Sequence, residues 1–90
     1  MVSSRAERRS HREDQVSELF GAKRSAAALD LLELVELSWH DCYGEVTPPD
    51  AVIEDILVLS GGDLAQLISA ARLAVDDWRD TRVAADALRH

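Results

Sequence analysis

The sequence predicts an all-α protein, a small bundle of three core helices preceded by a charged N-terminal segment. Its 90 residues suffice for one domain with one modest core. Aromatic residues make up only 4% of the chain, so the core must be built mainly from Leu, Val, Ile and Ala, which suits close helix packing. Apolar residues recur with helical spacing along three segments, and no convincing strand pattern interrupts them.

Residues 1–14 are a charged N-terminal segment, and residues 15–90 are expected to form a single helical domain. The stretch SSRAERRSHRED has no apolar periodicity, so it is expected to be either disordered or a charged helical extension. One apolar helical turn follows, formed by Val16, Leu19 and Phe20. Gly21 provides a stop for that turn.

The first core helix is expected over residues 25–43, with Ser25 as its N-cap and Gly44 as a left-handed stop. Its apolar stripe alternates spacings of four and three residues through Ala28, Leu32, Val35, Trp39 and Cys42. Acids occupy much of the remaining surface, and Leu37 among them is expected to be exposed. The helix therefore combines an apolar face with an acidic one.

The second core helix is expected over residues 49–60, with Pro49 at its first position. The stretch SGGD then forms a tight turn, because Gly61 and Gly62 permit positive φ and Asp63 can cap the next helix. So short a turn makes the two helices that it joins neighbours in space.

The last core helix is expected over residues 63–89 as a single rod, of which the stretch from Leu64 to Leu88 alone would be about 37 Å long. Its apolar stripe runs over three and a half heptads through Leu64, Leu67, Ala71, Ala74, Trp78, Thr81, Ala85 and Leu88. The shorter helices are expected to leave the C-terminal third of this rod uncovered. The sequence therefore predicts a homodimer in which Thr81, Ala85 and Leu88 of two last helices meet.

Charge is unevenly distributed along the chain, which has a net charge of -7. Residues 1–24 hold six basic and four acidic residues, residues 25–63 hold nine acidic residues and no Lys or Arg, and residues 64–90 hold four of each. The acidic middle block repels phosphates, so direct DNA binding is disfavoured, whereas a basic protein partner would be steered toward it. The alternative is that these acids only keep the domain soluble.

The run WHDCYG at residues 39–44 brings together an imidazole, a carboxylate and the only thiol of the chain. On a helix, His40 and Cys42 point about 200° apart, so His40 cannot easily activate the thiol as a nucleophile. Cys42 lies on the apolar stripe and is expected to be buried and inert. We therefore predict no catalytic residue and no enzymatic activity.

Metal and membrane binding are not predicted either. Glu36 and His40 have the i,i+4 spacing of a ligand pair, but two ligands are too few for a site, so we predict no metal and no cofactor. No apolar run approaches the roughly 18 residues of a membrane helix. A single cysteine cannot make an internal disulfide, which favours a reducing compartment, most simply the cytoplasm.

The stretch IEDILVLSGGDLAQLISAAR resembles a helix-turn-helix unit with a glycine turn. Its second helix carries only Arg72 as an early base, whereas a helix that reads DNA normally brings several. An N-terminal arm could add phosphate contacts through Arg5, Arg8, Arg9 and Arg12. A nucleic-acid-associated regulator that uses these arginines and the unit around Gly61 and Gly62 is therefore our alternative hypothesis.

Our main hypothesis is a small acidic helical protein–protein interaction module, such as an inhibitor, an immunity- or antitoxin-like protein, or a regulator. The size, the acidity and a late Trp-Arg pair are similar to those of colicin-type immunity proteins, but the Tyr-Tyr-Pro segment of that family is missing, and we do not assign the chain to it. Acids that flank exposed apolar positions are the expected partner-binding residues: Glu33, Glu36, Leu37, Asp41, Glu54, Asp55 and Val58.

Overall fold

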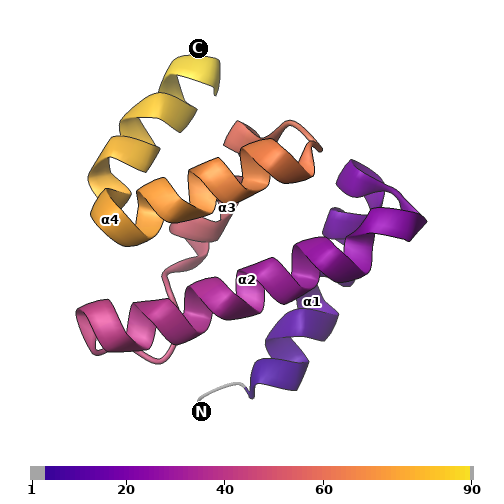
Figure 1. Cartoon of the computed structure of the whole chain (residues 1–90), viewed down its shortest axis with the longest axis horizontal. Coiled ribbons are helices and arrows are strands. Elements are labelled where there is room, and N and C mark those ends of the chain that lie inside the picture. Colours follow the sequence, from indigo (N-terminus) through magenta and orange to yellow (C-terminus); the bar gives the residue numbers. More distant parts are fainter. Residues whose placement is uncertain (1–3, 90) are drawn as a thin grey trace.

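Helices account for every regular element in the computed structural model, which describes residues 4–89. The four helices are α1 (Arg5–Phe20), α2 (Ala22–Tyr43), α3 (Asp50–Ser60) and α4 (Leu64–Arg89) (Figure 1). The prediction of an all-α bundle is confirmed, and the three expected core helices correspond to α2, α3 and α4.

The N-terminal segment is helical from Arg5, so the helical alternative is confirmed for it, while residues 1–3 lie outside the described part of the chain. Ser4 caps α1, because its side-chain oxygen accepts a hydrogen bond from the backbone N–H of Glu7 at 3.1 Å. Only Gly21 separates α1 from α2, which begins earlier than the sequence predicted.

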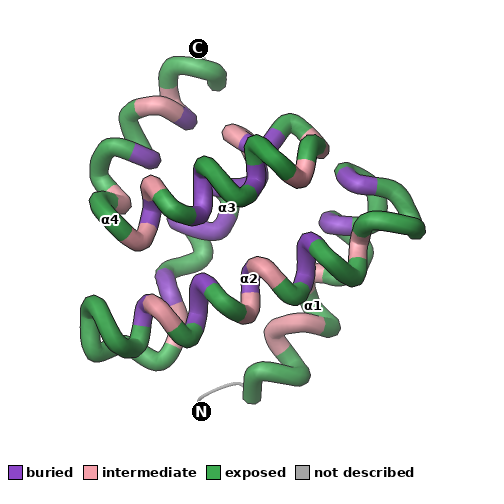
Figure 2. The backbone as a smooth tube through the Cα atoms, in the orientation of Figure 1, coloured by how far each residue is buried: buried purple, intermediate pink, exposed green. Residues whose placement is uncertain are grey.

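Two helix hairpins make up the molecule (Figure 1). α1 and α2 form the first, α3 and α4 form the second, and α2 packs against α4 where the hairpins meet. In the backbone tube of Figure 2, the buried residues lie mostly on the sides of the helices that are turned toward one another. Leu, Val, Ile and Ala dominate this core as expected, and Trp39 is the largest of its fully buried side chains.

A bend divides α4, which is therefore not the straight rod that the sequence predicted. Asp77 has non-helical backbone angles, with φ -154° and ψ 100°, and its Oδ1 accepts a hydrogen bond from the Arg79 N–H at 3.0 Å. Asp77 thus acts as an N-cap for a second helical segment. A straight helix of 26 residues would be about 39 Å long, whereas the molecule is 33 Å in its longest direction. The bend lets the C-terminal segment fold back within that length.

The bend also determines which residues of the C-terminal apolar stripe are buried. Thr81 and Ala85 are 0% exposed within a single chain, so the expectation that they remain uncovered is wrong. The segment carrying them turns back toward α3, where Arg89 pairs with Asp55 at 2.8 Å. Leu88 is exposed as expected. An interface built on the two buried residues would require this segment to unfold first, and dimerisation itself stays a prediction.

Candidate functional site

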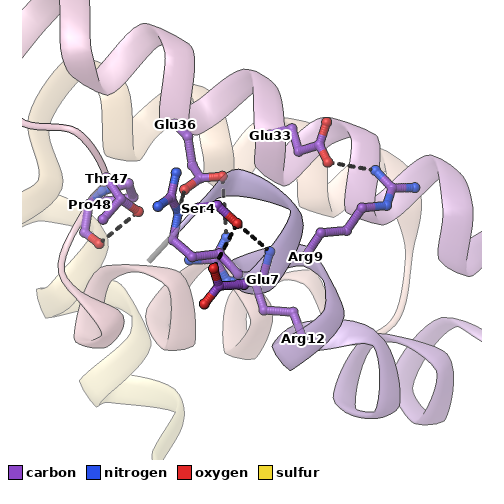
Figure 3. Close-up of polar contacts among 9 residues, drawn as sticks. Ser4, Glu7, Arg9, Arg12, Glu33, Glu36, Thr47 and Pro48 are labelled. Atoms are coloured by element: carbon purple, nitrogen blue, oxygen red, sulfur yellow. Dashed lines mark hydrogen bonds and ion pairs between the residues drawn. The ribbon is translucent and has the colours of Figure 1, made fainter. Parts of the chain in front are cut away.

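An arginine of α1 meets the first acids of the middle block across the α1–α2 hairpin. Arg9 Nη1 lies 2.7 Å from Asp30 Oδ1 and 3.0 Å from Glu33 Oε1. Figure 3 shows Arg9 reaching from α1 toward Glu33 on α2. The hydrogen bond to Asp30, and then that to Glu33, raises the pKa of Arg9 above its ordinary value. Arg9 therefore keeps its proton to a higher pH than an ordinary arginine.

A second contact of this hairpin buries a carboxylate. Glu36 is 1% exposed, and it pairs with Arg8 and faces Arg12 Nη1 at 3.8 Å. Both guanidinium side chains are nearly buried as well, and opposite charges are what make a buried carboxylate tolerable. We call the residues of these two contacts the α1–α2 charge cluster: Arg8, Arg9, Arg12, Asp30, Glu33 and Glu36.

The second hairpin contains a buried acid of its own. Asp55 is almost fully buried, and its Oδ1 accepts a hydrogen bond from Arg89 Nη1 at 2.8 Å. Arg89 also bonds to Asp86 at 3.0 Å, and these bonds, that to Asp55 first, raise the pKa of Arg89. Asp55 Oδ2 and the hydroxyl of Thr81 are buried without a hydrogen-bond partner in the described part of the chain.

These contacts remove two residues from the acidic face that the sequence predicted. Glu36 and Asp55 are buried and paired within the chain, so they cannot reach a partner while the chain is folded in this way. Glu33 is half-buried and paired with Arg9. The sequence pattern failed at the two buried acids because an acid is expected on the surface unless a specific base covers it.

The other predicted partner-binding residues lie in two separate hollows. Leu37 and Asp41 of α2 line a hollow of about 310 Å³ that Arg5 of α1 also borders. Glu54 and Val58 of α3 line another, of about 290 Å³. The structure therefore does not bring the seven predicted residues together on one face, and binding at the exposed ones stays a prediction.

The run at residues 39–44 is split by the end of α2. Trp39 is buried, as predicted, and its ring centre lies 4.3 Å from that of Tyr43. His40 and Asp41 are exposed, with His40 Nδ1 3.7 Å from Asp41 Oδ1. Cys42 is exposed, so the prediction that it is buried is wrong. The apolar stripe of α2 does not stay buried as far as Cys42, because the last turn of α2 borders an open groove instead of a covering helix.

That groove between α2 and α4 is our candidate site, because large apolar side chains are exposed in it. Its volume is about 830 Å³. On its α2 side Leu34 is 57% exposed, and on its α4 side Ile68 is 56% exposed. The remaining lining is formed by Leu31, Val35, Ser38, Cys42, Tyr43, Ala71, Arg72, Val75 and Asp76. The Tyr43 hydroxyl ties the two walls together by donating a hydrogen bond to the Val75 carbonyl at 3.1 Å.

Apolar spacing does not predict the groove, because Leu34 and Ile68 lie beside the core stripes of their helices and nothing in the spacing marks them as exposed. A signal for it was present in α2, where leucine or valine stands at 29, 31, 32, 34 and 35. Such a run spreads apolar side chains around more than half of a helix, which is more than one packing face can bury. The apolar residues of α2 that do not face the core form the exposed wall of the groove.

The helix-turn-helix-like unit is present as α3, a glycine turn and α4, but it lacks a basic surface. A Cβ atom built on Gly62 would lie 2.5 Å from the Leu19 carbonyl oxygen, so the turn is pressed against the end of α1. Arg72 is the only base in the first segment of α4. Arg8, Arg9 and Arg12 are paired with acids of α2, which leaves them poorly placed to act as a phosphate-binding arm.

Three further findings limit the functions that the described residues can have. Among residues 4–89, no three His, Cys, Asp or Glu side chains come together in a way that could hold a metal ion. No helix in that range has the length and apolar character needed to cross a membrane. In comparisons with known proteins, no family model matches the chain, and no curated protein or solved structure is significantly similar to it.

Proposed function

We propose that this protein is a small helical protein–protein interaction module that binds an amphipathic helix of a partner in the α2–α4 groove. The observation that carries the proposal is the exposure of Leu34 and Ile68, 57% and 56%, on the two walls of one groove. Large apolar side chains gathered at the surface mark places where another molecule binds. Grooves between helices accept the apolar side of a partner helix. By occupying its partner, such a module acts as an inhibitor or a regulator.

The polar side of the partner helix is expected to be basic. The chain has a net charge of -7, and the exposed acid Asp76 lies within the lining of the groove. Arg72 is the only basic residue in that lining. Long-range attraction would therefore steer a basic helix toward this side, and its association should slow as salt screens the charges.

Cys42 provides a direct test, because it is the only cysteine of the chain and lines the groove. A benzophenone group attached to this thiol should photo-crosslink to a partner from the native host. Mass spectrometry of the adduct should identify a basic amphipathic helix as the crosslinked segment. The reference chain carries Cys42→Ser and Val83→Cys, which moves the same label to an exposed position outside the groove.

Two matched variants decide whether the crosslink reports the groove. Leu34→Glu places a charge on the apolar wall and should remove most of the adduct. Val83→Glu changes an equally apolar exposed residue elsewhere on α4 and should leave the adduct unchanged. Adducts that survive Leu34→Glu, or that form equally from a label at position 83, would show that the groove is not the binding site.

The cytoplasm remains the compartment that we propose. Cys42 is a free thiol, and it is exposed. Free exposed thiols persist in reducing compartments, where glutathione and thioredoxin keep them reduced. Recovery of the native protein with Cys42 in a mixed disulfide would contradict this placement.

A further inference from the structure

A single residue forms the whole connection between α1 and α2. α1 ends at Phe20 and α2 begins at Ala22, and Gly21 between them has φ 83° and ψ 161°. This combination is accessible essentially to glycine alone. The Gly21 N–H donates to the Ser17 carbonyl at 2.9 Å, and its own carbonyl accepts from Ser25 N–H at 3.0 Å. Rotation at one residue would therefore convert the hairpin into a continuous helix.

The contacts that hold α1 in place can all be made by another copy of the same helix. Val16 and Phe20, its buried apolar residues, lie in the last turns next to the hinge. Farther from the hinge, α1 is held by the charge cluster and by the bond of Gln15 to Glu54. Each contact joins α1 to a separate element, so the contact is equally satisfied when α1 comes from a second chain.

Opening the hinge has a local advantage and a local cost. Helix ends leave backbone groups without intrahelical partners, and a continuous helix over residues 5–43 would satisfy them across the junction. Such a helix would be about 58 Å long. Its opening would uncover the core around Val16 and Phe20 and leave the Glu36 carboxylate without its bases. A free open chain is therefore unfavourable, and a second copy is the occupant that restores every one of these contacts.

We propose that two copies of this chain exchange their α1 helices, so that each α1 packs on the α2 of the other copy. The acceptor surface is the acidic side of α2 formed by Asp30, Glu33 and Glu36, and the ligand is the arginine-bearing helix of the partner copy. Exchange of an identical element is a low-cost route to a dimer, and short strained hinges favour it. This proposal does not depend on what occupies the α2–α4 groove.

Gly21→Ala is the first test. Alanine is disfavoured at the closed hinge but favoured inside a continuous helix, and both chains of the dimer gain from the change. The dissociation constant of the dimer should fall by at least about 100-fold, roughly a factor of ten for each hinge. Sedimentation equilibrium at about 10 μM, in the range of a specific interface, should show the variant mainly as a dimer and the wild type mainly as a monomer.

Gly44→Ala is the matched control. Gly44 also has a positive φ, 72°, and open space around its Cα, but it is followed by the loop to α3 and not directly by a helix. This variant should lose some stability without dimerising. If Gly21→Ala is also a destabilised monomer, or if both variants dimerise alike, the exchange of α1 is ruled out.

A pair of charge variants shows whether α1 crosses between copies. In one chain Arg9→Glu places an acid opposite Asp30 and Glu33, and in the other Asp30→Arg with Glu33→Arg places bases opposite Arg9. These positions retain solvent contact, so each chain should still fold. Both chains carry Gly21→Ala, and they are mixed in denaturant and refolded together, which prevents slow exchange from hiding the result.

Only α1 exchange brings the substituted charges of the two chains into attractive pairs. Native mass spectrometry should then show a heterodimer fraction well above the random one-half, because both homodimers place like charges opposite each other. A dimer through any other surface would assort randomly. Random assortment, or a mixture of monomers, would overturn the proposal.

Discussion

The two hairpins of this protein have the same plan but are held together by different forces. Each consists of two helices joined through glycine, by Gly21 in one and by Gly61 and Gly62 in the other. α3 buries four large apolar side chains within 11 residues, whereas α1 buries two within 16. Along most of its length α1 is held by the charge cluster instead. The difference predicts that the α3–α4 hairpin is held by its own apolar contacts. The N-terminal turns of α1, which lie far from Gly21, are the part most easily detached.

Ile56→Ala should have the largest effect, because it weakens the apolar hairpin directly. Ile56 is fully buried in the core. Removing a buried isoleucine side chain to alanine should lower the free energy of unfolding by about 2–5 kcal/mol. Urea denaturation should show a lower midpoint with an unchanged slope. Val83→Ala, at an exposed apolar position, should change it by less than about 0.5 kcal/mol.

The double substitution of Arg8→Ala and Arg12→Ala should have a smaller global effect. A carboxylate trapped without its bases would cost about 3–5 kcal/mol, but detachment of the first turns of α1 lets water reach Glu36. We therefore expect a loss of only about 1–2 kcal/mol, less than that trapped-charge penalty. Hydrogen exchange should show lost protection over residues 5–14 with α3 unchanged. Equal loss of protection in all four helices would show that α1 is instead an integral part of one cooperative unit.

Asp77→Ala tests how much one polar contact contributes to the stability of the α3–α4 hairpin. Its side chain caps the second segment of α4 through the Arg79 N–H at 3.0 Å. Loss of an N-cap costs typically about 1 kcal/mol, which thermal unfolding can resolve. Asp76→Ala removes the same charge one residue earlier, and no hydrogen bond of its side chain is lost with it, so it is the matched control. Similar effects of the two substitutions would mean that charge, not capping, is what matters at the bend.

Salt should have the smallest effect, and it should act mostly on α1. The raised pKa of Arg9 means that, while Asp30 and Glu33 are ionised, its contribution is fully present below the ordinary arginine pKa and is lost as pH rises through the raised pKa. Ionic strength is therefore the practical way to weaken the pair near neutral pH. Exposed ion pairs contribute little to stability because solvent screens them. Raising NaCl to about 1 M, where the Debye length is about 3 Å, should lower exchange protection in residues 5–14 by a few fold. Protection in α3 should not fall.

The same contrast explains what could be predicted from the sequence. Apolar spacing and glycine stops locate α2, α3 and α4 to within a few residues, because those helices are specified by a core that each of them helps to form. α1 has no such pattern, since its partners are charges 21 to 28 residues away. Arg9 and Glu33 are equally far from Gly21 along the chain, a symmetry typical of a hairpin, and it could have indicated their pairing.

The bend in α4 and the groove were harder to predict for different reasons. Asp77 lies in a charged stretch with no proline or glycine to mark a break, and its capping role depends on the local backbone. The groove depends on how α2 and α4 lie relative to each other, which no spacing of residues specifies. Surplus leucines in α2 signal that something apolar remains exposed, but not which helix lies opposite.

Gly62 has a consequence for how this chain can change in evolution. The nearest atom to a side chain added there would be the carbonyl oxygen of Leu19, at 2.5 Å, and a backbone carbonyl cannot step aside as a flexible side chain can. A neutral drift to alanine in the α3–α4 turn would therefore be felt in the other hairpin, at the end of α1 next to Gly21, as a displacement of α1. At Gly44 the surrounding space is open but φ is 72°, so we expect homologues to carry glycine or asparagine there. Position 62 should stay glycine for as long as α1 keeps its present position.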